Sequence, residues 1–254
     1  MARAGCLAAA LAVAALLAVA AALAWFLLLA DDPEPALVDD AVTTFREGGS
    51  RGGSPVPEGV YVYATDGYER TDALTGVTHR YPSRSTITVT GDECGVRMRW
   101  DVLDGRSTTW TFCVTGSAWT LASQDERHTF FGRTERTTYE CTGLRFRPDG
   151  DRPGEVSAAT CRAGSTDERS TMRVVGRRRL DVGSREVDLV HLRRSSAFTG
   201  EIRGASTHDV WLDRETGVPV LLRLESETTN DAPVGDVRYR EEVTMRLLSL
   251  TPRR

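Results

Sequence analysis

The sequence predicts an all-β domain preceded by a single apolar N-terminal helix, and three observations carry that prediction. The first is an uncharged apolar run at residues 4–30. The second is an alternation of apolar and polar residues that recurs from residue 59 onward, as in strands with one buried face. The third is the placement of Gly, Asp and Pro between these segments. Many short strands separated by turns indicate a sheet, a barrel or a sandwich.

The apolar run is long enough to cross a membrane. As a helix, residues 4–30 would extend about 40 Å, more than the ~30 Å hydrocarbon core. The run exceeds a signal-peptide core, and Leu28-Leu29-Ala30 is a poor cleavage site, so we favour an uncleaved anchor at residues 1–30 over a cleaved signal peptide. Arg3 before the run and acidic residues after it predict a single-pass protein of the cell membrane, with the N-terminus inside and the C-terminal domain outside.

Composition excludes a nucleic-acid partner. The chain has 254 residues, with 32 basic residues, all arginine, and 36 acidic residues. The two signs are interspersed, so no basic face forms along the chain. The part beyond the anchor has the length of one domain or two small ones.

A juxtamembrane segment at residues 31–58 separates the anchor from the β-domain, which we place at residues 59–252. Residues 36–47 have apolar side chains at helical spacing, which predicts a short amphipathic helix. Residues 48–57 are rich in Gly, Ser and Pro, as in a flexible linker. The apolar positions of the helix are Leu37, Val38, Ala41, Val42 and Phe45.

The clearest hairpin joins residues 96–102 to residues 108–114 through Asp104-Gly105, a strong turn signal. If the loop has three residues, Trp100 lies opposite Trp110 and Met98 lies opposite Phe112. We expect residues 142–168, rich in Gly, Pro, Asp and Arg, to form a loop. The other predicted strands are residues 60–63, 85–90, 118–123, 127–131, 134–140, 170–175, 187–193, 206–212, 218–227 and 237–250.

Four cysteines beyond the anchor, an even number, predict two disulfides in an oxidising compartment. Three pairings are possible; we favour Cys94 with Cys113 and Cys141 with Cys161, which close the shortest loops. The first pair would need a bulge at Gly95 to bring both sulfurs to one face. No Cys-x-x-Cys spacing supports a metal site instead.

Asp213 and Glu215 lie close together beside Trp211, which raises the question of an acid/base pair. We interpret residues 214–217 as a turn between two strands, with Gly217 free to adopt a positive φ. Pro219 at the start of the second strand suggests an edge or a bulge. Carboxylates in a charged turn are solvated, so Asp213, Gly217 and Pro219 are predicted to be structural.

The run Trp-x-Asp-x-x-Thr-Gly-Val-Pro-Val at residues 211–220 resembles a hairpin of the lipoprotein-carrier superfamily, LolA-like and LppX-like, over about residues 170–250. The resemblance implies an antiparallel curved sheet or half-open barrel around an apolar cavity, with short helices on the concave side. The chain lacks the lipobox of that superfamily, and the disulfides depart from its pattern. With Gly59-Val-Tyr-Val-Tyr63 and paired cysteines, the chain also resembles an uncharacterised family of membrane-anchored bacterial extracytoplasmic proteins, which implies no activity.

Other candidate sites are weak. Gly48-Gly-Ser50-Arg-Gly52 matches a nucleophile motif but lies in a linker without the required strand and helix. The four histidines are dispersed, although His191 and His208 are close enough in sequence to meet across strands. Arg177-Arg-Arg179 is predicted to be a solvated turn, with contact to anionic headgroups as the alternative.

The sequence therefore predicts a binding protein rather than an enzyme, with no cofactor and no metal. Its ligand would be an apolar or lipid-like molecule held without catalysis in the curved sheet. The alternative is a structural or protein-interaction module of the cell envelope with a filled core. Core packing is the simpler role for the large apolar residues, and a ligand groove is the other. The possible groove residues are Met98, Trp100, Trp110, Phe112, Trp119 and Trp211.

Overall fold

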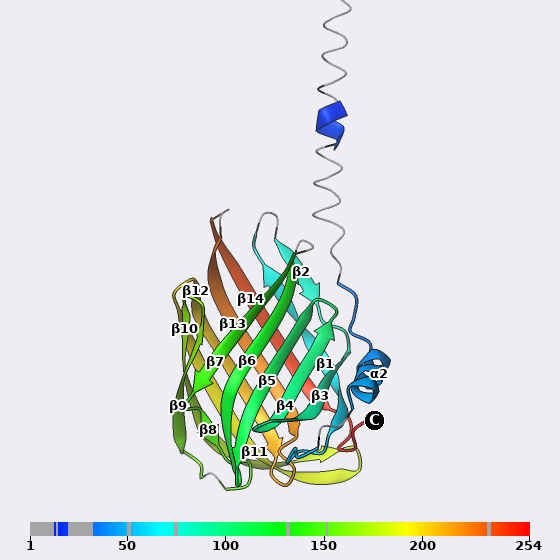
Figure 1. Ribbon diagram of the computed structural model, residues 1–254, viewed down its shortest axis with the longest axis vertical. Coiled ribbons are helices and arrows are strands. Elements are labelled where there is room, and N and C mark those ends of the chain that lie inside the picture. Colours follow the sequence, from blue (N-terminus) through cyan, green and yellow to red (C-terminus); the bar gives the residue numbers. More distant parts are fainter. Residues whose placement is uncertain are drawn as a thin grey trace, which may run out of the picture.

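Strands dominate the computed structural model, which describes residues 13, 15–19, 33–49, 52–73, 76–130, 133–150, 152–232 and 235–254. Fourteen strands form one antiparallel sheet, and a helix, α2 (Val38–Gly48), lies beside it (Figure 1). The strands are β1 (Gly59–Thr71), β2 (Val77–Arg80), β3 (Arg84–Asp92), β4 (Gly95–Leu103), β5 (Arg106–Thr115), β6 (Ala118–Phe130), β7 (Arg133–Thr142), β8 (Arg145–Phe146), β9 (Val156–Ala163), β10 (Thr166–Val182), β11 (Arg185–Thr199), β12 (Ile202–Asp213), β13 (Pro219–Ala232) and β14 (Gly235–Leu247).

The sheet closes into a barrel, so the expectation of a half-open sheet is wrong. β1 pairs with β3 along one edge, and its other edge pairs with β14 from Tyr63↔Leu247 to Thr71↔Tyr239. Two short strands stand outside the ring, because β2 extends the edge of β1 and β8 pairs with β6. The other twelve strands form a closed ring, which removes unpaired edges.

The helix α2 lies on the outer face of the barrel and not on its concave side (Figure 1). Val42 and Phe45 form a small buried cluster with Val60 of β1. Val60 points outward, because the inward positions of β1 are Tyr61 and Tyr63, which belong to the main core. The amphipathic helix predicted at residues 36–47 is therefore present, but its apolar face covers the outside of a strand.

The long β10–β11 hairpin reaches across one end of the barrel, at the bottom of Figure 1. A register shift between Val174 and Gly176 marks the irregularity in β10 before the tip. Beyond it, Val182 and Val187 are buried in the core. Arg246 of β14 donates to the carbonyl of Asp181, which ties the tip to the far side of the ring.

Both predicted disulfides are present with the favoured pairings, Cys94–Cys113 and Cys141–Cys161. Cys94 lies in the turn before β4. Its side chain therefore does not follow the alternation of inward and outward faces in that strand, and no bulge is needed at Gly95. Cys141 and Cys161 are direct partners on β7 and β9. The second disulfide therefore links the two strands directly across their ladder.

The β4–β5 hairpin differs in register from a three-residue loop. Met98 pairs with Trp110, and Trp100 pairs with Thr108. Asp104 and Gly105 alone form the turn, and a bulge between Asp101 and Leu103 takes up the remaining offset.

The expected loop at residues 142–168 is wrong, because it contains β8 and β9. The β9 segment carries small residues and buries only Ala159 and Cys161, so its apolar alternation is weak. The segments predicted separately at residues 118–123 and 127–131 belong to one strand, β6, which has a bulge opposite Thr111 and Phe112; residue 131 lies outside the described residues.

The predicted anchor at residues 1–30 lies largely outside the described residues, and only residues 13 and 15–19 of it are described, as helix. Within the described part of the chain, no helix is both long and apolar enough to span a membrane. At the end of the predicted linker, Val56 is buried in the core and Pro57 accepts a hydrogen bond from the Tyr61 hydroxyl.

We expect each disulfide to stabilise the barrel by about 3 kcal/mol, because each closes a loop of about twenty residues in the unfolded chain. Urea unfolding of Cys94→Ala/Cys113→Ala and of Cys141→Ala/Cys161→Ala measures both losses. The two loops are nearly equal in length, so a larger loss of stability for Cys141→Ala/Cys161→Ala would be attributed to the burial of Cys161. Losses below about 0.5 kcal/mol for both pairs would contradict the expectation.

Candidate functional site

The interior of the barrel contains a cavity of about 830 Å³, within the size range of small-molecule sites. Its walls come from inward-facing residues of β5, β6, β7 and β10 to β14. Residues near the strand ends at the β6–β7, β9–β10, β11–β12 and β13–β14 connections also line it. These connections lie opposite the β10–β11 hairpin, so one end of the barrel carries the cavity while the other is packed.

Strand alternation with one bulge decides which side chains of β6 face inward. Trp119 and Leu121 point into the core in the first half of the strand. The bulge between the pairs Thr111↔Ser123 and Phe112↔Leu121 adds one residue and changes the phase. As a result Gln124, Glu126 and His128 all line the cavity.

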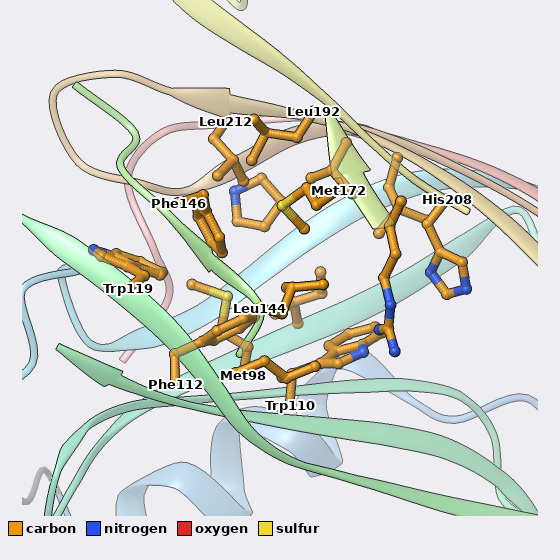
Figure 2. Close-up of a pocket in the computed structure, with 16 residues that line it drawn as sticks. Met98, Trp110, Phe112, Trp119, Leu144, Phe146, Met172, Leu192, His208 and Leu212 are labelled. Carbon is orange, nitrogen blue, oxygen red and sulfur yellow. The ribbon is translucent and has the colours of Figure 1, made fainter. Parts of the chain in front are cut away.

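The deep end of the interior is apolar (Figure 2). Phe112, Trp119 and Phe146 pack with ring centroids 5.6–5.8 Å apart around a smaller space of about 80 Å³. Both cavities share the lining residues Trp110, Arg194, His208 and Leu222, so they adjoin. The interior therefore grades from an apolar end to a polar end.

Five of the six possible groove residues line these spaces. Met98, Trp110, Phe112 and Trp119 surround the apolar end, and Trp100 lines the larger cavity. Trp211 lines neither space, although it is buried and packs with the core.

Trp211 lies on the outer face of β12. It stacks on His191 with ring centroids 4.1 Å apart, and the guanidinium groups of Arg178 and Arg223 lie over its ring. His208 points into the barrel, so His191 and His208 are on opposite faces and do not meet.

A buried ion pair spans the polar end of the barrel. Arg106 of β5 donates from Nη2 to both carboxylate oxygens of Glu241 on β14, at 3.0 and 2.9 Å. Both side chains are 3% exposed. Arg106 also donates to Thr108 Oγ1 and lies over the ring of Trp100, and Tyr81 donates its hydroxyl to Glu241. Both charged groups of this pair therefore have partners within the barrel wall.

Glu69 connects this pair to two histidines. Its carboxylate lies 3.0 Å from His79 Nδ1 and 3.5 Å from His128 Nδ1, and it accepts a hydrogen bond from Tyr239. Burial alone would raise the pKa of Glu69, but the interactions with His128 and His79 and the charge of Arg106 lower it to about 2. Glu69 is therefore ionised at neutral pH.

His128 lies between two carboxylates. Its Nε2 is 3.6 Å from Glu126 Oε2, on the side away from Glu69. Burial and Arg106 disfavour the imidazolium, whereas Glu126 and Glu69 favour it and raise the pKa of His128 above its usual value. Burial likewise opposes ionisation of Glu126, but His128, Arg106 and Gln124 lower the pKa of Glu126 to about 2.

A second buried pair completes the polar wall. Arg194 of β11 donates to Glu168 of β10 at 2.5 Å and to Gln124 Oε1 at 2.9 Å. Gln124 in turn donates to Glu126 Oε1 at 2.6 Å. Burial and the adjacent Arg194 charge lower the pKa of His208 to about 3, so His208 is neutral. One polar network therefore runs from β10 through β6 to β1 and β14.

The residues of the predicted turn make hydrogen bonds within it, but Asp213 is buried, so the expectation of a solvated carboxylate is wrong at this position. Asp213 accepts hydrogen bonds from the Glu215 amide and the Thr216 hydroxyl, and the Gly217 amide donates to the Asp213 carbonyl. Gly217 has φ 75°, and a Cβ there would lie 2.7 Å from the Trp119 ring. Pro219 follows a register shift in the β12–β13 ladder.

Two other predicted features lie away from the cavity. Residues 177–179 belong to β10, so the expected solvated turn there is wrong. Arg179 is nevertheless exposed and pairs with Glu186 and Asp188 across the β10–β11 hairpin. Ser50 of the Gly-x-Ser-x-Gly match lies outside the described residues.

Sequence reasoning missed the polar network, although a signal for it exists. Arg194 stands in phase with Leu192 on the inward face of β11, and Glu241 stands in phase with Val243 and Met245 on β14. A charge in register with an apolar face predicts a buried ion pair. The partners themselves are unpredictable from the sequence, because Arg106 and Glu241 are 135 residues apart.

Comparison with known proteins assigns no family. No protein-family model and no curated protein matches the chain. The chain is similar to a solved structure, the hypothetical lipoprotein YmcC from Escherichia coli (K12), with 13% identity and a TM-score of 0.28. The likeness covers 80% of this chain and 95% of that one. A score this low carries no argument about the fold or the function.

We expect Arg106→Met to cost about 3–5 kcal/mol of stability, because it leaves the buried Glu241 carboxylate without its cation. Arg179→Met is the matched control, since its ion pairs are exposed to solvent and contribute little to stability. Urea unfolding compares the two variants. Equal losses would contradict a stabilising role for the buried pair.

We also expect the free energy of unfolding to decrease in two stages as the pH is lowered. From about pH 6.5 towards 3, His208 stays neutral in the folded state but is protonated in the unfolded chain. From about pH 4.5 towards 2, Glu69 and Glu126 stay ionised only in the folded state. Urea unfolding at a series of pH values should show a shallower first stage for His208→Gln. An unchanged first stage would contradict a neutral folded His208.

Proposed function

We propose that the barrel binds one amphiphilic small molecule without catalysis. The observation that carries the proposal is the cavity of about 830 Å³, which adjoins an apolar end and has a polar wall. A structural module with a filled core would have no reason to keep such a space open, because empty volume forfeits dispersion contacts. A ligand restores these contacts when it binds.

The two ends of the cavity suit the two ends of an amphiphile. The alkyl part of the ligand lies against Phe112, Leu222 and neighbouring apolar residues. Each methylene group buried there contributes about 0.8 kcal/mol. The polar part faces the network of Glu126, His128 and Arg194.

Binding fits the polar network better than catalysis does. The two arginines and their glutamates neutralise one another through hydrogen bonds within the wall. His128 lies between two carboxylates that raise its pKa and so favour the imidazolium, the form without a lone pair for a general base. We therefore propose a carrier or receptor of small molecules and not an enzyme.

The same proposal places the barrel outside a cell membrane. Disulfides form and persist in oxidising compartments, and the apolar run at residues 4–30 would tether the domain with its N-terminus inside. A tethered domain is well positioned to exchange amphiphiles with the adjacent bilayer.

Native mass spectrometry of the purified full-length chain tests the proposal. We expect a bound molecule of discrete mass that is lost on denaturation, and organic extraction of the same sample identifies it. A chain that carries only its sequence mass less four hydrogens, and that takes up nothing from a lipid extract, would favour the protein-interaction module.

A paired substitution assigns the bound molecule to the cavity. Ser226→Trp fills part of the cavity from β13, whereas Ser195→Trp adds the same ring to the exposed face of β11. We expect the first variant to lose bound ligand at least about tenfold, equivalent to ~1.4 kcal/mol, and the second to keep it. Equal occupancy in both variants would place the ligand elsewhere.

A further inference from the structure

The polar end of the cavity carries more carboxylates than guanidinium groups. Four glutamates belong to the network: Glu69, Glu126, Glu168 and Glu241. Against them stand the guanidinium groups of Arg106 and Arg194 and the imidazolium of His128.

The remaining histidines add no guanidinium-like charge at this wall. His208 is neutral because burial and Arg194 lower its pKa to about 3. His79 Nδ1 lies 3.0 Å from Glu69, so this ring is already engaged with a carboxylate of the network. Four carboxylates therefore face two guanidinium groups.

The terminal nitrogens of both arginines in the wall are already engaged. Arg106 donates to Glu241, Ser107 and Thr108, and Arg194 donates to Glu168, Gln124 and Ser170. An anionic headgroup would have to displace a buried carboxylate to reach either arginine. At the rim, Arg133 and Arg136 are accompanied by Glu135, Glu201 and Asp231, so the mouth supplies no positive excess either.

Acceptors also remain available, beside two donors without a hydrogen-bond partner among the described residues, Arg106 Nε and His128 Nδ1. Glu126 lines the cavity, and its side chain is 28% exposed. Glu168, 1% exposed, also lines the cavity, and its Oε2 has no hydrogen-bond partner among the described residues. The Oδ1 of Asn230 is in the same situation. A ligand could donate a hydrogen bond to each of these oxygen atoms, and a cationic ligand could pair with the carboxylates.

Aromatic rings surround the same space. Phe130 and Tyr239 of the lining lie 6.1 Å apart, and Tyr139 and Phe198 lie 6.4 Å apart on neighbouring walls. The face of an aromatic ring attracts a cation, most of all where water is excluded. Carboxylates combined with aromatic faces provide the environment that an organic ammonium group needs.

We propose that the ligand is a cationic amphiphile whose ammonium group binds beside Glu126, among these aromatic rings, while its alkyl chain enters the apolar end. This inference rests on the proposed function and specifies the ligand class of the same cavity. The positive headgroup would pair with the carboxylates that line the cavity, whereas an anionic headgroup would approach them as a like charge.

The test compares three probes of equal chain length with the full-length protein: decyltrimethylammonium, decyl sulfate and 1-decanol. Each is titrated below its solubility or micelle limit by calorimetry, and Ser226→Trp measures binding outside the cavity. We expect the ammonium probe to bind at least about tenfold more tightly than the sulfate, a difference of ~1.4 kcal/mol.

A matched pair of variants locates the headgroup. Glu126→Gln should weaken the ammonium probe about tenfold, with decanol unaffected, because only a charge is removed. Glu135→Gln makes the same change at the rim, where the side chain is 65% exposed, and should leave all three affinities within about twofold. The probe comparison in the unmodified chain stands even if Glu126→Gln does not fold.

The outcomes separate the two proposals. Sulfate binding as tight as ammonium binding would overturn the cationic headgroup but keep amphiphile binding. An equal loss of all three probes in Glu126→Gln would overturn the role of its charge. If no probe binds more tightly to the unmodified chain than to Ser226→Trp, the cavity is not a binding site and both proposals fail.

Discussion

The pairing of β1 with β14 is the constraint on which the rest of the structure depends. These strands come from opposite ends of the domain, and their ladder converts a sheet into a ring. Once the ring closes, the inward side chains of every strand are cut off from bulk water except through the ends. An inward polar group must then find its partner within the barrel, because an unpaired buried charge is strongly destabilising.

The interior meets this requirement differently at its two ends. At the end crossed by the β10–β11 hairpin, apolar side chains and aromatic rings fill the space, as around Phe112 and Trp119. At the other end, ion pairs such as Arg106–Glu241 join opposite walls, and a cavity remains between them. A closed wall with an open interior has the shape that the proposed binding function requires.

Much of the local structure was predictable, because it depends on neighbours in sequence. The disulfide Cys94–Cys113, the Asp104-Gly105 turn and the hydrogen-bonded turn around Asp213 all form within short segments. The incorrect predictions arose where the local sequence pattern was weak or ambiguous. The β9 strand has small, mixed side chains, and the helix at residues 38–48 has an apolar face that does not reveal which side of a sheet it covers.

The sequence by itself determined that the domain is built of antiparallel strands and where many of them lie, and it favoured the cysteine pairing that is observed, because alternation, turn residues and short loops are local properties. Only the tertiary structure decided that the sheet closes, that α2 lies outside, that Trp211 faces outward and that Glu69, Glu126 and His128 meet in one network. A period of two defines two faces of a strand but leaves open which face is enclosed. That choice is made by pairing between strands far apart in the chain, and no local pattern encodes it.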